Sequence, residues 1–148
     1  MVLVLERLRA DFNVPKIFRS AQALGARAIH LVGVGPFDPA PAKGAFKHVP
    51  ARFHEDFGSC RDALLGEGYT LFALHPHDGA LLPSLALPER SAFILGHEQD
   101  GLSAEVLGDA RVTPVRIPHA GALESLNVAV AASIALYEYA RNRSGAPP

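Results

Sequence analysis

Residues 92–103 read AFILGHEQDGLS and give the strongest indication of the architecture of the chain. The run Ala92–Leu95 is entirely apolar, as is typical of a parallel strand covered on both faces. Gly96 ends the run and Gly101 follows shortly after, so the backbone is free to turn tightly and to approach a ligand. Parallel sheets bind ligands beyond the carboxyl ends of their strands. We therefore expect a central strand that leads into a ligand-binding loop, with a plain turn as the alternative.

Short apolar runs alternate with helix-like segments on both sides of this stretch, which is typical of a parallel α/β sheet. The expected strands are Val2–Leu5, Ala28–Val34, Ala51–His54, Tyr69–Leu74, Ala92–Leu95 and Val112–Ile117, the last interrupted by Pro114. The expected helices are Pro15–Gly25, one near 58–67, a short one from Ser103 and a long one near 125–141. Loops without regular structure are expected over 33–50, where glycine and proline are frequent, and over 75–90. The sequence thus predicts one parallel α/β domain over residues 1–148.

The composition fits a globular protein and excludes a disordered one. Of 148 residues, 49% are hydrophobic and 20% are charged, which is enough apolar material to bury a core. The longest nearly apolar run, Val128–Tyr137, is half of the roughly 20 residues that cross a bilayer. A single cysteine, Cys60, cannot form an intramolecular disulfide or a multi-thiolate zinc site, and it suits a reducing compartment. A cytoplasmic location without membrane association is therefore expected.

Charge and hydropathy each indicate a partner. The net charge is only −1, but residues 1–52 carry eight basic and three acidic side chains, and the remaining residues sum to −6. If the first third folds onto one face, it offers a basic surface to a phosphate backbone; scattered solvated charges are the alternative. The final helix is apolar on nearly all sides, so the core or a second copy must enclose it. A homodimer is therefore expected.

Three other motifs have simpler explanations than a cofactor or metal site. Gly33-x-Gly35 is similar to the start of a dinucleotide-binding loop, but Asp38 stands where a third glycine belongs and no helix begins there. His75-Pro76-His77-Asp78 offers imidazoles and a carboxylate, but the proline and the lack of further ligands favour a polar loop. Cys60 lies in a helical stretch and is expected to be a small core residue.

Three junctions between a strand and a helix carry polar groups that a plain scaffold does not need. Asn13 and Arg19 lie at the mouth and in the second turn of the first helix, where an arginine can grip a phosphate; a helix cap and a surface arginine are the alternative. Glu98 lies in the glycine-containing loop and can accept hydrogen bonds from amides. Ser125 and Asn127 lie at the start of the last helix, where they can cap it or reach a substrate.

Together these segments resemble the SpoU/TrmH family of RNA ribose methyltransferases, within the SPOUT superfamily. The resemblance covers most of the chain. It lies in three motifs that follow in order: Asn13–Gly25, Leu95–Ser103, and Ile117–Ala131, which includes Pro118, Gly121 and Ser125-Leu126-Asn127. The third motif is the most specific. His97 and His119 depart from the family pattern, which usually has Asn or Ser at the first position and Met at the second.

The resemblance implies a parallel sheet whose C-terminal part passes through a loop to form a trefoil knot, which the hydrophobic pattern alone does not predict. It implies S-adenosylmethionine bound among the knotted loops, with Leu74, Gly96, Ile117 and Leu126 around the adenosine. It also implies a homodimer with the final helix at the interface, and no metal. Because many relatives carry an added RNA-recognition domain, this chain is expected to be close to the catalytic minimum, with no separate RNA-binding domain.

The activity that the resemblance implies is methyl transfer from S-adenosylmethionine to a ribose 2′-hydroxyl of tRNA or rRNA. The protein must then align donor and acceptor and assist the loss of one proton. We expect Arg19 to grip the adjacent phosphate and to stabilise the developing alkoxide, since guanidinium is almost never deprotonated. Asn13 is expected to hold Arg19 or the ribose, and Glu98 to brace the loop. Ser125 and Asn127 are expected to position the acceptor.

Two alternatives stay open, a knotted RNA-binding module without catalysis and a base methyltransferase on the same fold. The presence of Arg19, Glu98 and Ser125-Leu126-Asn127 counts against the first. In each case RNA is expected to meet a basic face of the dimer. That face includes Arg7, Arg9, Lys43 and Lys47.

Overall fold

The computed structural model describes residues 1–120 and 124–144. Within these ranges seven strands form one sheet, and every pair of neighbours runs parallel. In chain order the strands are β1 (Val2–Glu6), β2 (Ile29–Val32), β3 (Ala51–His54), β4 (Thr70–Leu74), β5 (Ala80–Leu81), β6 (Ser91–Leu95) and β7 (Val112–Arg116). Their spatial order is β3-β2-β1-β6-β4-β7-β5, which confirms the parallel α/β fold. The expected knot stays a prediction, since the described residues leave a gap between β7 and the last helix.

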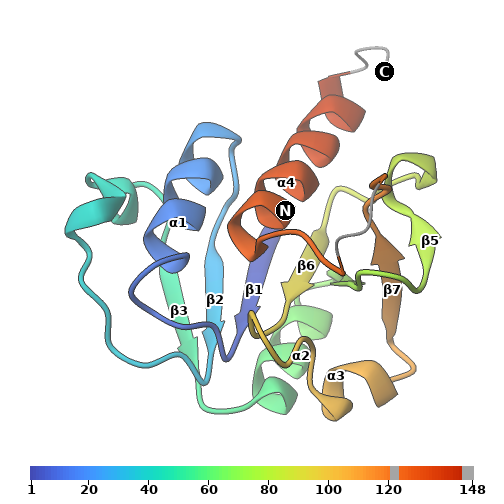
Figure 1. Ribbon diagram of the computed structural model, residues 1–148, viewed down its shortest axis with the longest axis horizontal. Coiled ribbons are helices and arrows are strands. Elements are labelled where there is room, and N and C mark those ends of the chain that lie inside the picture. The colour runs from blue at the N-terminus through green and yellow to red at the C-terminus, as the bar shows by residue number, and fades with distance from the viewer. Residues whose placement is uncertain (121–123, 145–148) are drawn as a thin grey trace.

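Helices cover both faces of the sheet (Figure 1). They are α1 (Val14–Ala23), α2 (Phe57–Gly66), α3 (Ala104–Gly108) and α4 (Val128–Ser144). The helices α1 and α4 pack side by side on one face, while α2 and α3 lie on the other. Successive strand residues point to opposite faces, so in β1 Leu3 and Leu5 join the layer of α1 and α4, and Val2 and Val4 join that of α2. Two apolar layers therefore enclose the sheet.

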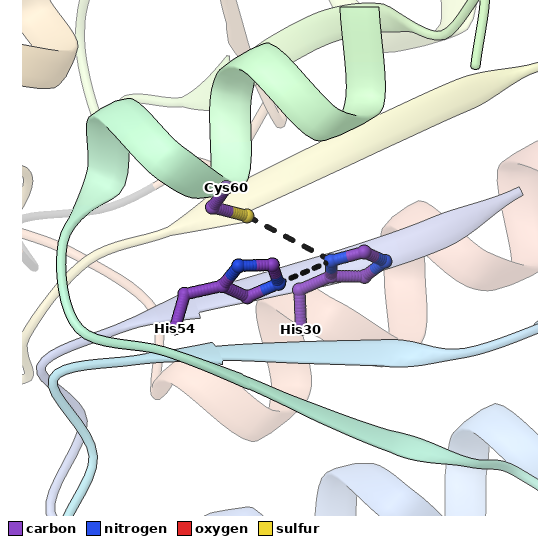
Figure 2. Close-up of side chains that lie close together, drawn as sticks. All are labelled: His30, His54 and Cys60. Atoms are coloured by element: carbon purple, nitrogen blue, oxygen red, sulfur yellow. Dashed lines mark hydrogen bonds between the residues drawn. The ribbon is translucent and has the colours of Figure 1, made fainter. Parts of the chain in front are cut away.

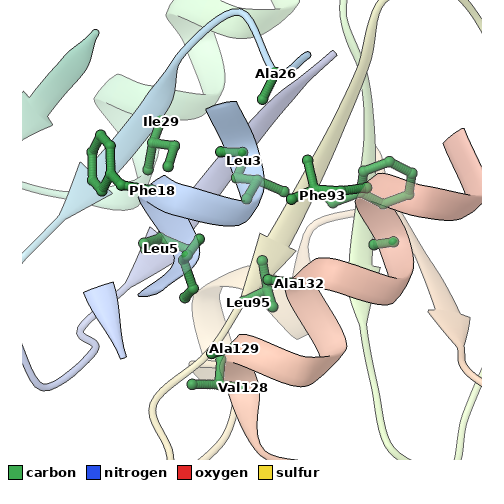
Figure 3. Packing of buried hydrophobic residues seen from close by; sticks show 14 of the residues in the cluster. Leu3, Leu5, Phe18, Ala26, Ile29, Phe93, Leu95, Val128, Ala129 and Ala132 are labelled. Atoms are coloured by element: carbon green, nitrogen blue, oxygen red, sulfur yellow. The ribbon is translucent and has the colours of Figure 1, made fainter. Parts of the chain in front are cut away.

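The strand β6 occupies the middle of the sheet, between β1 and β4, and all of its residues are buried. Phe93 and Leu95 belong to the layer of α1 and α4. The α4 residues in the same layer include Val128, Ala129 and Ala132 (Figure 3). Ala92 and Ile94 belong to the opposite layer. The expected central strand is confirmed.

The strand β7 is continuous through Pro114, although the sequence predicts an interruption there. Pro114 lies opposite Ala73 of β4 and keeps the register of the pair. On the other side of β7, β5 begins to pair only at Val115. There the Pro114 carbonyl lies so close to Gly79 that a Cβ on this glycine would be 2.1 Å from the oxygen. No neighbouring strand therefore needs the N–H that proline lacks.

The final helix starts later than the sequence predicts. Asn127 Oδ1 accepts hydrogen bonds from the backbone N–H groups of Ala129 (2.9 Å) and Val130 (3.3 Å), and so it caps α4. Ser125 is exposed and precedes the helix, so the expected start near residue 125 is wrong. The helix also continues to Ser144 instead of ending near residue 141. Of the two candidate caps, only Asn127 acts as one.

Two predicted loops contain short regular segments. The segment 75–90 includes β5 and a 3₁₀ turn at Leu82–Ser84, which the buried side chain of Leu82 anchors. The segment 33–50 includes 3₁₀ turns at Ala40–Ala42 and Ala45–Lys47, which pack against α1. Frequent glycine and proline prevent long elements here, but they are compatible with single turns.

The final helix is not enclosed on all sides within one chain. Ala132, Ala135 and Leu136 are fully buried, but Val130 is 48% exposed and Tyr137 is 58% exposed. The core of one chain therefore encloses only part of α4, an apolar part of the helix faces outward, and enclosure of that part by a second copy stays a prediction. In the part of the chain that the structure describes, no helix combines the length and the hydropathy needed to span a membrane.

We expect Phe93→Ala to lower the free energy of unfolding by about 3–5 kcal/mol, because it removes a large, fully buried side chain from the central strand. Phe53→Ala on β3 is the matched control. Phe53 is 65% exposed, so its removal should change stability by less than about 0.5 kcal/mol. Urea denaturation followed by circular dichroism measures both variants. Equal losses would contradict the central position of β6.

Candidate functional site

A cavity of about 620 Å³ lies at the carboxyl ends of β4, β6 and β7, beside the start of α4. Its volume is in the range of small-molecule sites. The four residues expected around an adenosine all line it: Leu74, Gly96, Ile117 and Leu126. Glu98, Ser125 and Asn127 line it as well. The structure therefore brings residues from two of the three sequence motifs, together with the end of β4, into one cavity.

The glycine loop, residues 96–101, folds back on itself directly after β6. His97 and Gly101 exchange two backbone hydrogen bonds, of 3.0 and 2.9 Å. A Cβ on Gly96 would lie 2.3 Å from the backbone carbonyl carbon of Gly101, so no side chain fits there. Gly101 has a φ of +69°, in the left-handed region that glycine adopts freely. Both glycines are thus required by the loop, as the sequence pattern predicts.

Glu98 joins the three junctions that the sequence singles out. Its Oε1 accepts a hydrogen bond from Asn13 Nδ2 at 2.8 Å, and its Oε2 accepts one from the backbone N–H of Arg9 at 3.1 Å. Asn13 Oδ1 accepts a further hydrogen bond from Asn127 Nδ2 at 3.3 Å. Asn13 is buried at the start of α1 but makes no side-chain cap, so its amide is available to this network. Asn13, Glu98 and Asn127 therefore form one polar network beside the cavity.

A carboxylate suits this position because it accepts hydrogen bonds at both oxygens. Asn13 and Arg9 both present donors to it, and an amide side chain would direct its own NH₂ group at one of them. Burial raises the pKa of Glu98, but the hydrogen bonds from Asn13 and Arg9 outweigh this effect, and the pKa lies below its usual value of 4.5. Glu98 is therefore ionised at neutral pH.

Glu6, the last residue of β1, also holds the segment after β6, which the motifs did not indicate. Its Oε2 accepts a hydrogen bond from the Ser103 backbone N–H at 3.0 Å, and Glu6 is only 3% exposed. A carboxylate directly after the apolar run Val2–Leu5 is the sequence signal that marks it. Two buried or partly buried carboxylates thus fix the beginning and the end of this segment.

Two turns that each contain a histidine and an aspartate line the cavity, and their histidine–aspartate contacts were not predicted. His75 Nδ1 accepts a hydrogen bond from the Asp78 backbone N–H at 2.9 Å and faces the Asp78 carboxylate at 3.4 Å. In the same way, His97 Nδ1 accepts a hydrogen bond from the Asp100 backbone N–H at 3.2 Å and faces the Asp100 carboxylate at 3.1 Å. The spacing His-x-x-Asp directly after β4 and after β6 is the signal that could have indicated them. The stretch from His75 to Asp78 therefore forms a polar turn, which confirms the polar loop favoured by the sequence over a metal site.

The basic side chains expected on an RNA-binding face divide into two groups. Arg7 and Arg9 both donate side-chain hydrogen bonds to the glycine loop, at 3.4 and 2.7 Å. Lys43 and Lys47 are exposed at the 3₁₀ turns beside α1. The two arginines thus have a structural contact that the sequence did not indicate, while the two lysines face outward.

Arg19 does not line the cavity. It is exposed on α1, about 9 Å along the helix axis from Asn13 at 1.5 Å per residue. Within the described residues its side chain has no hydrogen bond or ion pair. Gly121 of the third motif lies outside the described residues. Among the predicted site residues that the structure describes, Arg19 alone is therefore separate from the cavity and its network.

An apolar groove of about 630 Å³ runs between α1 and α4. The two helices are joined there by a hydrogen bond of 2.8 Å from the Ser133 hydroxyl to the Ser20 hydroxyl. The apolar side chains in the groove include Val130, Ile134 and Tyr137. Ser20 lines the groove and is the chain neighbour of Arg19, so this arginine lies next to the groove.

Comparison with known proteins identifies relatives whose matched regions cover nearly the whole chain. The SpoU rRNA Methylase family matches residues 1–137. A tRNA (guanosine(18)-2′-O)-methyltransferase from Escherichia coli strain K12 is 29% identical over 150 residues, which cover 99% of this chain. The chain spans 65% of the length of that relative.

Solved structures show the same fold. The SpoU methyltransferase AviRb from Streptomyces viridochromogenes, in complex with AdoMet, matches with a TM-score of 0.87 at 26% identity, over 98% of this chain and 61% of that one. A structure described as giving insight into the 2-OH methylation of C/U34 on tRNA matches with a TM-score of 0.82 at 33% identity. That match covers 97% of this chain and 96% of the other.

We expect Glu98→Gln to lower the free energy of unfolding at neutral pH by about 1 kcal/mol, the net value of one hydrogen bond, because glutamine accepts at only one side-chain oxygen. The folded-state pKa of Glu98 is depressed, so its contribution is complete above about pH 4.5 and is lost as the pH falls through the folded pKa. The difference between wild type and Glu98→Gln should therefore shrink on acidification. Urea denaturation at a series of pH values measures it, with exposed Glu55→Gln as the control. A difference that does not vary with pH would contradict this role.

Proposed function

The chain belongs to the SpoU rRNA methylase family, and from this membership we propose that it transfers a methyl group from S-adenosylmethionine to a ribose 2′-hydroxyl of an RNA. The observation that carries the proposal is the polar network of Asn13, Glu98 and Asn127 beside one cavity. The three residues come from junctions that are far apart in the sequence and that the sheet brings to one edge. The similarity to AviRb, whose structure contains AdoMet, supports the choice of methyl donor.

The cavity fits this donor in volume and in chemistry. Leu74, Ile117 and Leu126 offer apolar walls for an adenosine, and Gly96 leaves the backbone open to close approach. The Glu98 carboxylate offers a negative charge near a cationic ligand. S-adenosylmethionine, when bound, supplies a methyl group that its sulfonium charge already activates.

The residues of the chain itself must hold the acceptor and favour the loss of its proton. Ser125 offers an exposed hydroxyl at the cavity. Asn127 uses its Oδ1 to cap α4 and one N–H to reach Asn13, which leaves one N–H for a ribose oxygen. Arg19 grips the phosphate next to the target ribose and stabilises the alkoxide that develops there.

The position of Arg19 favours a site that two copies of the chain complete. Arg19 lies apart from the cavity of its own chain but next to the groove between α1 and α4. The exposed Val130 and Tyr137 make this groove suitable for a second copy. A homodimer formed through α4 covers the apolar side chains and places the Arg19 side chains at the edge of the interface.

The substrate that we propose is tRNA in the cytoplasm, with C or U at position 34 as the first nucleotide to test. The structure described for 2-OH methylation of C/U34 on tRNA is 33% identical to this chain. The guanosine-18 enzyme of Escherichia coli is 29% identical. The higher identity favours the first substrate as the one to test first.

We expect Arg19→Ala to reduce methyl transfer by at least about 100-fold, the loss typical of removing one stabilising donor. Binding of S-adenosylmethionine should be unchanged, because Arg19 does not line the cavity of its own chain and is assigned to the phosphate of the RNA and not to the methyl donor. Incorporation of labelled methyl groups into unmodified tRNA measures methyl transfer, and calorimetric titration measures the binding of S-adenosylmethionine. Arg27→Ala, another exposed arginine, is the control. Retained turnover in Arg19→Ala would contradict the assignment.

Two outcomes of these assays with the unaltered protein would favour the other functions. Nuclease digestion and mass analysis of the product nucleosides distinguish a methylated ribose from a methylated base. An absence of heat on titration with S-adenosylmethionine would favour an RNA-binding module without catalysis. A methylated ribose outside position 34 would leave the reaction intact and overturn the choice of nucleotide.

A mixture of two inactive variants tests whether the site is shared between copies. Gly96→Val disrupts the glycine loop, because a side chain there meets the Gly101 backbone. If Arg19 acts in the cavity of the other copy, coexpression of Arg19→Ala with Gly96→Val should restore activity to about a quarter of that of wild type, since half of randomly formed dimers are mixed and carry one intact site. No recovery in purified mixed dimers would show that each chain uses its own arginine.

A further inference from the structure

His30, His54 and Cys60 place three metal-binding side chains together, away from the cavity (Figure 2). His30 Nδ1 lies 2.9 Å from His54 Nε2 and 3.8 Å from Cys60 Sγ. The three donor atoms all lie within 4.8 Å of one another. They belong to β2, β3 and α2, and none of the three residues lines the cavity.

The fold itself fixes this arrangement. The strand neighbours of His30 point to the layer of α1 and α4, so His30 points to α2. His54 pairs with Val32, whose side chain lies in the α2 layer, so the ring of His54 is on the same face. Cys60 is fully buried in the first turn of α2, directly above these strands. Two of the three ligands are thus held rigidly by the core.

We propose that His30, His54 and Cys60 bind one zinc-class divalent cation. Two imidazole nitrogens and one thiolate are donors that Zn²⁺ prefers, and three protein ligands leave a fourth position for water. Around a tetrahedral Zn²⁺ two bound nitrogens lie about 3.3 Å apart, and a nitrogen and a sulfur lie about 3.6 Å apart. The separations of 2.9 and 3.8 Å in the structure are close to these values. A small shift of the half-buried His54 ring completes the site.

The surroundings of the cluster keep both imidazoles neutral. Burial, together with His54 and Arg52, lowers the pKa of His30 to about 4, so protons do not compete with a cation at neutral pH. Burial and Arg52 also lower the pKa of His54. Burial raises the pKa of Cys60 to about 12, so the cation must displace the thiol proton. Each ion bound therefore forms one metal–sulfur bond and releases one proton to solvent.

The three side chains also contact one another directly. His30 is only 1% exposed, and its Nδ1 is within hydrogen-bonding distance of both His54 Nε2 and Cys60 Sγ. An apolar side chain would fill the position of His30 without the cost of burying a polar ring. The donor atoms of all three side chains therefore converge on one point, as they do in a metal site.

The position of the cluster at the edge of the sheet lets a cation enter from solvent and lets the bound ion stabilise that edge. The strand β3 is at the edge of the sheet and His54 is partly exposed, so a cation reaches the cluster from solvent. The nearby Arg52 is paired with Glu67 at 3.1 Å, which offsets its repulsion of a cation. The bound ion ties β3 and α2 to β2. Since it binds the folded chain, it stabilises this edge of the sheet.

Titration with Co²⁺ tests the site in the full chain, because a Co²⁺–thiolate bond produces a charge-transfer absorption in the near ultraviolet. We expect a single Co²⁺ per chain with this absorption, displaced by Zn²⁺ and unaffected by Mg²⁺, which prefers oxygen ligands. Zn²⁺ should also raise the Tm of the wild-type protein. These readouts do not depend on methyl transfer.

His54→Gln is the most informative variant, because His54 is partly exposed and its replacement should preserve the fold. Removing a residue that is only hydrogen-bonded to a metal ligand lowers metal affinity by roughly 10–100-fold. Removing the ligand His54 itself should therefore lower Co²⁺ affinity by more than this. Cys60→Ser should abolish the charge-transfer absorption. His77→Gln, which alters an exposed histidine outside the cluster, should change neither readout. Co²⁺ binding without this absorption, equal affinity in His54→Gln and wild type, or no binding at all would overturn the proposal.

Discussion

The site depends on one carboxylate that accepts hydrogen bonds from residues far away in the sequence. Glu98 accepts from the Asn13 side chain, 85 residues away, and from the Arg9 backbone, 89 residues away. Through Asn13 it is also linked to Asn127, the cap of α4. Each segment by itself is a polar loop at a strand end, whose groups would otherwise be solvated. Joined in a partly buried network, these groups become a fixed wall for the cavity.

The network in turn depends on the order of strands in the sheet. Leu5 of β1 pairs with Leu95 of β6, so the loops that follow these strands leave the same edge side by side. Glu98 and Arg9 lie three and four residues beyond this pair, and they meet across it. The glycine loop folds back on itself and so keeps Glu98 near the sheet. Only a glycine at position 96 allows this conformation. The central position of β6 thus determines which loops can share a site.

Sequence patterns were sufficient wherever the signal lies in neighbouring residues. The strand Ala51–His54 was predicted with its observed bounds, and Asn13, Glu98 and Asn127 could be selected because polar side chains at strand ends have no packing role. The pairings between them were not predictable, since no local pattern encodes a contact across 85 residues. The cluster of His30, His54 and Cys60 is hidden for the same reason: it depends on the register between β2 and β3. The sequence therefore indicated which residues form the site, whereas the contacts between them depend on the topology of the sheet.

The two roles of Asn127 connect the surface of α4 with the interior of the cavity. Its Oδ1 fixes the first turn of the helix, and its Nδ2 reaches Asn13 in the network. Two residues of the same helix, Val130 and Tyr137, leave large apolar surfaces exposed. Asn127 is therefore the residue that joins the first turn of α4 to the polar network at the cavity wall, and the exposed apolar side chains lie on the helix that it caps.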